Sequence, residues 1–151
     1  MQHHIVEVTP VIDTNAYTAN DQVGGIMTLS GAVPGPGDGA ILRQISVVDK
    51  AKQSVAITVL LFDALPTVAS SNNAAIDITD AEMADKALAS VSVAAGDYVA
   101  LANSSLATKA TTTPVKAAAE SSTLYAVALT TGTPTYGSTS DLVFRLHFTW
   151  E

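Results

Sequence analysis

The segment LYAVALTTGTPTYGSTSDLVFRLHFTW, residues 124–150, decides the fold of this chain. Its final third places apolar side chains at every second position and mostly polar ones between them. The apolar positions are Leu142, Phe144, Leu146, Phe148 and Trp150. A period of two is typical of a strand with one buried face. Because residues 124–131 form a second apolar run before a Gly/Pro connector, we expect an antiparallel sheet that is covered on one side.

Further strands are predicted at residues 4–8, 23–30, 40–48, 53–62, 91–93, 98–101 and 115–117. Turn residues separate them at intervals of roughly 8 to 12 positions, as in sandwiches and barrels. The run 53–62 is apolar on both faces, which favours a strand in the middle of a sheet. Residues 49–52 indicate a hairpin turn between the strands at 40–48 and 53–62. The fold class is therefore all-β, an antiparallel β-sandwich, with the jelly roll as one form it could take.

One short helix is expected near residues 80–86. Thr79 is followed three positions later by Glu82, the spacing of a capping box at a helix start. Nearby carboxylates, Asp77, Asp80 and Asp85, match no calcium-binding loop, and acidic residues at a helix start favour its dipole. We interpret them as capping residues.

Residues 31–39 contain four glycines and two prolines, which excludes regular structure there. This loop suggests a division into an N-terminal arm and loop, residues 1–39, and a β-sandwich body, residues 40–151, within a single domain. The apolar run Ile5–Val8 then predicts an arm that docks on a neighbouring subunit. Deleting residues 1–22 should, on this interpretation, leave the body folded. Gly24 and Gly25 indicate a bulge or a close backbone approach.

Composition excludes several classes of partner. The net charge is −7 with only seven dispersed basic residues, so a cationic surface for nucleic acid is not expected. The longest apolar run has eight residues, far below the ~20 that cross a bilayer, so we expect no membrane partner. Charged residues make up only 14%, while Ala, Thr and Ser number 25, 18 and 13. Such a neutral surface of small side chains suits contact with another protein.

The chemical motifs give no indication of an enzyme. Cysteine is absent, and the three histidines are His3, His4 and His147. A histidine-based metal site needs about three converging ligands. No serine lies in a nucleophile elbow, and no glycine-rich loop ends as a phosphate loop does. We therefore expect no catalytic, metal or cofactor residues and no cofactor.

Several phrases of the chain resemble those of a known family, from about Ala40 to the end. The most specific is Gly132-Thr-Pro-Thr-Tyr136 followed by Ser138-Thr-Ser-Asp-Leu142. The others are Lys52-Gln53, Leu61-Phe62-Asp63, Pro66, Asn72-Asn-Ala-Ala75, Asp80, Asp97-Tyr98, Ala107-Thr-Lys109, Pro114-Val-Lys-Ala117 and Thr123-Leu-Tyr125. The chain resembles small virion proteins of tailed bacteriophages that are described as structural, decoration or cement proteins.

This resemblance implies a protein on the outside of a phage capsid that stabilises the shell by bridging capsomers. Its partners would be the major capsid protein and further copies of itself, as a trimer in preference to a dimer. An acidic protein would be repelled by packaged DNA, which also favours the outer face. The candidate interface residues are Ile5, Val6, Val8, Tyr17, Val33, Pro34, Pro36, Tyr136 and Trp150. The alternative is a head-fibre or receptor-binding sandwich that recognises host glycans through Tyr17, Tyr136 or Trp150.

Overall fold

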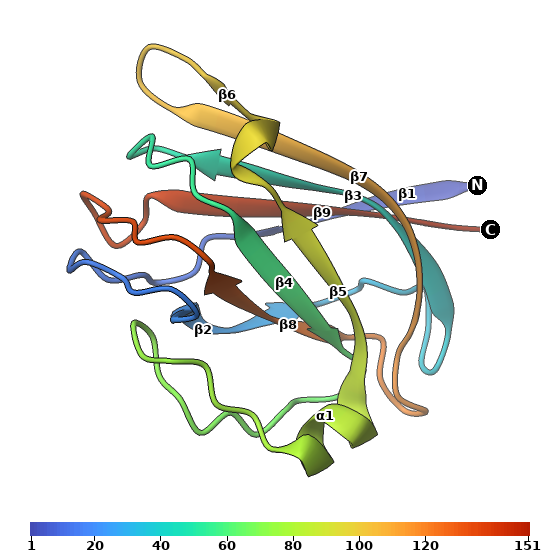
Figure 1. Ribbon diagram of the computed structural model, residues 1–151. Coiled ribbons are helices and arrows are strands. Elements are labelled where there is room, and N and C mark those ends of the chain that lie inside the picture. The colour runs from blue at the N-terminus through green and yellow to red at the C-terminus, as the bar shows by residue number, and fades with distance from the viewer.

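The computed structural model describes residues 1–151 and contains two antiparallel sheets packed face to face (Figure 1). The five-stranded sheet has the order β1 (Gln2–Val8), β9 (Leu142–Trp150), β3 (Gly39–Asp49), β7 (Ser105–Lys116) and β6 (Tyr98–Ala100). The four-stranded sheet has the order β2 (Gln22–Leu29), β8 (Leu124–Thr130), β4 (Ile57–Phe62) and β5 (Ala87–Val93). The all-β sandwich expected from the sequence is confirmed.

The connectivity is that of a jelly roll. If the three-residue β6 is left aside, the strand orders are β1-β9-β3-β7 and β2-β8-β4-β5. Successive strands mostly cross from one sheet to the other, and the last two strands insert beside the first two. Chains with this arrangement form two packed sheets of four strands through two Greek keys.

The core lies between the inner faces of the two sheets. Alternation along β9 puts Leu142, Phe144, Leu146 and Phe148 inside with no exposed surface. From the facing sheet, β4 contributes the fully buried Ile57, Val59 and Leu61. As expected, β4 is an interior strand, hydrogen-bonded to β8 and β5. The period-two pattern of the sequence therefore creates the two apolar faces that pack together.

The predicted helix is present as α1 (Asp80–Lys86), at the lower end of the view in Figure 1. Thr79 caps it, since its hydroxyl accepts a hydrogen bond from the Glu82 amide at 3.2 Å. The carboxylate of Glu82 instead forms an ion pair with Lys86 at 2.7 Å. Thr79 thus forms the cap, while Glu82 stabilises the helix through its ion pair with Lys86, one turn further along.

Residues 1–39 do not form a separate arm, which corrects the division expected from the sequence. All seven residues of β1 pair with β9, and β2 pairs with β8 of the same chain. Residues 31–38 of the predicted loop are irregular, and Gly39 already belongs to β3; the loop connects β2 and β3 of one sandwich. A Gly/Pro-rich loop looks the same in sequence whether it is a tether or a connection between sheets, because strand pairing depends on distant residues.

The predicted hairpin at residues 49–52 is also wrong. β3 belongs to the five-stranded sheet and β4 to the four-stranded sheet, so the turn passes between sheets. Buried Asp49 organises it, accepting hydrogen bonds from the amides of Ala51 and Ser54, both at 2.9 Å. Lys52 and Ser54 have positive φ angles, 54° and 53°, which turn the chain away from β3.

β7 is much longer than the segment 115–117 predicted for it. It begins at Ser105, and its inner positions hold small or half-buried residues such as Ala107 and Lys109. Alanine and threonine differ little in hydrophobicity, so most of β7 lacks the clear alternation of apolar and polar residues that indicates a strand. Pro114 is tolerated because β6 covers only residues 105–107 of β7, which leaves the rest of that side without a strand partner.

Candidate interaction surfaces

The nine predicted interface residues do not form one surface. Four of them belong to the core of the sandwich: Val6, Val33, Tyr17 and Tyr136 are each less than a tenth exposed. Val8 and Trp150 are half-buried, and only Ile5, Pro34 and Pro36 are exposed. Most of these apolar and aromatic side chains therefore stabilise this chain from within and are not available to a partner.

Tyr17 and Tyr136 pack against each other where the loop after β1 meets the connector before β9. The Tyr17 hydroxyl donates to Asn72 Oδ1 at 2.7 Å and accepts from the Asp13 amide at 2.9 Å. The Tyr136 hydroxyl is buried with no hydrogen-bond partner, and burial raises the pKa of this phenol strongly, with a further contribution from Asp49. Neither ring presents a face to solvent, so neither can stack on a sugar.

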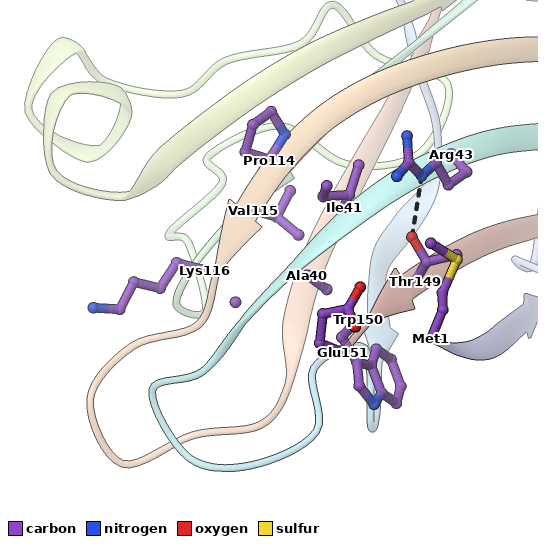
Figure 2. Close-up of a pocket in the computed structure, with 11 residues that line it drawn as sticks. Met1, Ala40, Ile41, Arg43, Pro114, Val115, Lys116, Thr149, Trp150 and Glu151 are labelled. Carbon is purple, nitrogen blue, oxygen red and sulfur yellow. Dashed lines mark hydrogen bonds between the residues drawn. The ribbon is translucent and has the colours of Figure 1, made fainter.

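Trp150 is held on the inner side of β9 by His4, with the two ring centroids 5.8 Å apart. Its neighbour Thr149 has the opposite orientation and accepts a hydrogen bond from Arg43 Nε at 3.1 Å. Figure 2 shows the indole and the guanidinium on opposite sides of the strand. The tryptophan ring is thus part of the packing at the end of the sandwich.

A groove of about 450 Å³ lies on the outer face of the five-stranded sheet, near the two chain ends (Figure 2). Its lining includes Ile41, Arg43, Pro114 and Lys116. Arg43 sits at a bulge, where the register of β3 against β9 shifts between Leu42 and Gln44. Lys116 is directed away from Arg43 in Figure 2. The two cations do not converge on one point, and we assign no ligand to this groove.

An apolar row crosses the outer face of the five-stranded sheet at its other end. It runs over four strands and consists of Val99, Leu106, Val48 and Val143. Each member is directly opposite the next: Val99 pairs with Leu106, Leu106 with Val48, and Val48 with Val143. Val99 is 64% exposed and Leu106 is 39% exposed, while Val48 and Val143 are half-buried.

Leu101, which is 54% exposed, extends the apolar row into the turn between β6 and β7. That turn is closed by a hydrogen bond of 2.7 Å from the Leu101 amide to the Ser104 carbonyl. The hairpin lies at the top of Figure 1, at the opposite end of the view from α1. Two positions further along the strands, on the same face, Thr108 of β7 lies directly opposite Ser46 of β3. The apolar strip itself carries no charge. It is bordered by Thr108 and Ser46, and by exposed Arg145, which is opposite Ser46 and follows Val143 on the same face of β9.

Sequence reasoning missed the apolar row. The strand 98–101 was predicted, and its odd positions could have indicated an outer apolar face. The contribution of Leu106, Val48 and Val143 depends on the register of four strands that are distant in sequence, which no local pattern contains.

The remaining chemistry of the surface offers no assembled site. No group of three or more His, Cys, Asp or Glu side chains is arranged to hold a metal ion. None of the helical segments has the length and apolar character to cross a membrane. His147 lies on the outer face of β9, where burial, Arg145 and His3 lower its pKa below the ordinary value. No protein-family model matches this chain, and no curated protein matches its sequence.

Proposed function

We propose that this protein is a structural component of a bacteriophage particle that binds the outer surface of the capsid and stabilises it by bridging capsomers. The proposal joins the resemblance in the sequence to one structural observation, the apolar row of Val99, Leu106, Val48 and Val143 with Leu101 beside it. The surface that contacts the major capsid protein is this end of the five-stranded sheet. No enzymatic step is part of the proposal.

The apolar row supports a protein contact because it is contiguous and free of charge. The largest contiguous apolar patch on a soluble protein often marks an interaction site. The neighbouring Thr108 and Ser46 side chains are small, so they can pack closely at little cost in side-chain entropy, and their hydroxyls can donate hydrogen bonds at the rim. Jelly rolls occur in viral capsid domains as well as in lectin domains, so the fold is compatible with both hypotheses.

The glycan-binding alternative has less support. It needs an exposed aromatic face, and Tyr17 and Tyr136 are each only 2% exposed. Trp150 is half-buried against His4. The net charge of −7 favours a position outside the shell, where packaged DNA does not repel the protein.

Binding to capsid shells prepared without this protein tests the proposal. Val99→Asp and Leu101→Asp should each reduce co-sedimentation with the shells by about tenfold, because each places a charge in an apolar contact. Leu65→Asp is the matched control, since Leu65 is 58% exposed on a different part of the molecule. Since the apolar row contains no charge, binding of the unmodified protein should change little between low and high salt.

The stabilising role is tested separately, on particles with equal DNA content. Particles that lack the protein should release DNA at a lower temperature, and adding the protein back should restore the higher value. Identical release curves with and without the protein would remove the role as a cement. Loss of shell binding in Leu65→Asp to the same degree as in Val99→Asp would remove the apolar row as the contact surface.

A further inference from the structure

The four edges of the two sheets differ in how well they are protected against pairing with another strand. β2 has a register shift between Val23 and Met27, and β5 is irregular where it pairs with Leu61 and Phe62. The β6–β7 edge combines a strand of three residues with Pro114. Bulges, prolines and short strands are the devices by which proteins prevent edge-to-edge association.

β1 has none of these devices. Its seven residues pair with β9 in one uninterrupted register from Gln2–Trp150 to Val8–Phe144, and it contains no proline, glycine or lysine. Its other side has no strand partner. Ile5, at the centre of the strand, is 43% exposed on the outer face. An unprotected edge with an apolar centre can accept one more strand.

The sequence of β1 is complementary to itself in the antiparallel direction. The only register that pairs all seven residues of β1 with a second copy puts Ile5 on a two-fold axis, opposite Ile5 of the other copy. In that register His3 faces the second copy's Glu7, and Glu7 faces its His3. An imidazole N–H can donate to a carboxylate, so this pair forms twice across the axis. In its own chain Glu7 is only loosely paired, with Arg145 Nε at 3.6 Å.

We propose that β1 is a homodimer interface, at which two copies pair edge to edge through Gln2–Val8 about a two-fold axis at Ile5. The two five-stranded sheets become one continuous sheet. His3, Ile5 and Glu7 of both copies lie on its outer face, because residues directly opposite in a ladder share a face. A two-fold contact gives a dimer, in place of the trimer expected from the sequence.

The proposed dimer does not depend on the proposed capsid role. If both hold, dimer formation strengthens binding to the capsid. The joined sheet carries both apolar rows on the same side, so two contacts could be made by one particle-bound dimer. The dimer interface is at the β1 edge, whereas Val99 and Leu101 lie at the opposite, β6 edge of the sheet. A variant that loses shell binding can therefore be distinguished from a variant that loses dimerisation.

An engineered cysteine tests the two-fold axis directly, since the chain has no cysteine of its own. In an antiparallel pair, opposite Cα atoms are about 4.5 or 5.5 Å apart, and both distances lie within the range that a disulfide spans. The full-length Ile5→Cys protein should therefore form a covalent dimer under mild oxidation. Val11→Cys is the control, because Val11 is 74% exposed and lies outside β1; this variant should form little covalent dimer under the same oxidation.

Charge variants test the register, with the dimer dissociation constant measured by sedimentation. His3→Glu should raise this constant by about tenfold, because it sets two carboxylates opposite each other at both ends of the pair. Adding Glu7→Lys to His3→Glu should restore the original value. Equal cross-linking of Ile5→Cys and Val11→Cys, a monomer at millimolar concentration, or a double variant as weak as His3→Glu would each overturn the proposal.

Discussion

The ring of Tyr17 stands edge-on to the ring of Tyr136, with centroids 5.8 Å apart and planes at 76°. This contact packs the long loop after β1 against the connector before β9. Beside it, the Tyr17 amide donates a hydrogen bond of 2.9 Å to the Pro134 carbonyl. The phrase with the most specific resemblance in the sequence thus contains a structural residue, Tyr136. Its ring stabilises the end of the sandwich.

The two tyrosines should respond oppositely to loss of the hydroxyl. Tyr17→Phe removes two hydrogen bonds and leaves the Asp13 amide without its partner, so the free energy of unfolding should fall by about 1–2 kcal/mol. Tyr136→Phe removes a buried hydroxyl that has no partner, so stability should be unchanged or higher. Urea unfolding of both variants measures the difference. A loss in Tyr136→Phe as large as in Tyr17→Phe would show that its hydroxyl is hydrogen-bonded in solution.

Two adjacent glycines in β2 provide a second matched pair. Gly24 has a φ of +76°, and a Cβ atom there would lie 2.7 Å from Cβ of Pro10. Gly24→Ala should therefore cost more than about 1 kcal/mol of stability. A Cβ atom on Gly25 meets nothing within 4 Å, so Gly25→Ala should be neutral or slightly stabilising. Thermal unfolding distinguishes them, and equal midpoints would contradict the close approach of Pro10.

The elements that the sequence predicted well are those with a strong local signal. Alternation of large apolar residues defined β9, apolar residues on both faces placed β4 inside a sheet, and Thr79 marked the start of α1. Each of these signals lies within about ten neighbouring residues. The bulge at Gly24 is also predicted by a local signal, two consecutive glycines within a strand.

Contacts between segments that are distant in the sequence could not be predicted. Tyr136 lies in a connector of glycine, proline and threonine, a composition typical of exposed loops, and is buried only because the loop containing Tyr17 covers it. In the sequence alone β1 resembles a detachable arm, because its partner, β9, is more than a hundred residues away. The apolar row likewise exists only after β6, β7, β3 and β9 are in register.

The stability of the protein should depend on His147 below pH 6.5. Burial, Arg145 and His3 lower the pKa of this ring in the folded state, so the folded protein binds fewer protons there than the unfolded chain does. The free energy of unfolding should therefore fall as the pH drops through 6.5 toward the folded-state pKa. His147→Gln should flatten that part of the curve. If urea midpoints of the two proteins fall in parallel between pH 7 and 5, another group is responsible.

Removing β1 should destabilise the sandwich, contrary to the behaviour of a detachable arm. Deleting residues 1–8 takes away the strand that pairs with residues 144–150 of β9, exposes one side of that interior strand and removes the buried Val6. We expect a loss of several kcal/mol, on the order of 3, since both core packing and a strand ladder are lost. The measurement is urea unfolding at a protein concentration where every variant is monomeric.

The full-length Ile5→Lys variant is the control for this deletion. Ile5 is exposed, so the substitution keeps β1 on β9 while placing a charge at the centre of the free edge. Its monomer should unfold at nearly the unmodified urea concentration, whereas the deletion variant should unfold much earlier. If the deletion variant is instead as stable as Ile5→Lys, β1 contributes little to the monomer. Its seven paired residues would then act mainly in contacts between copies.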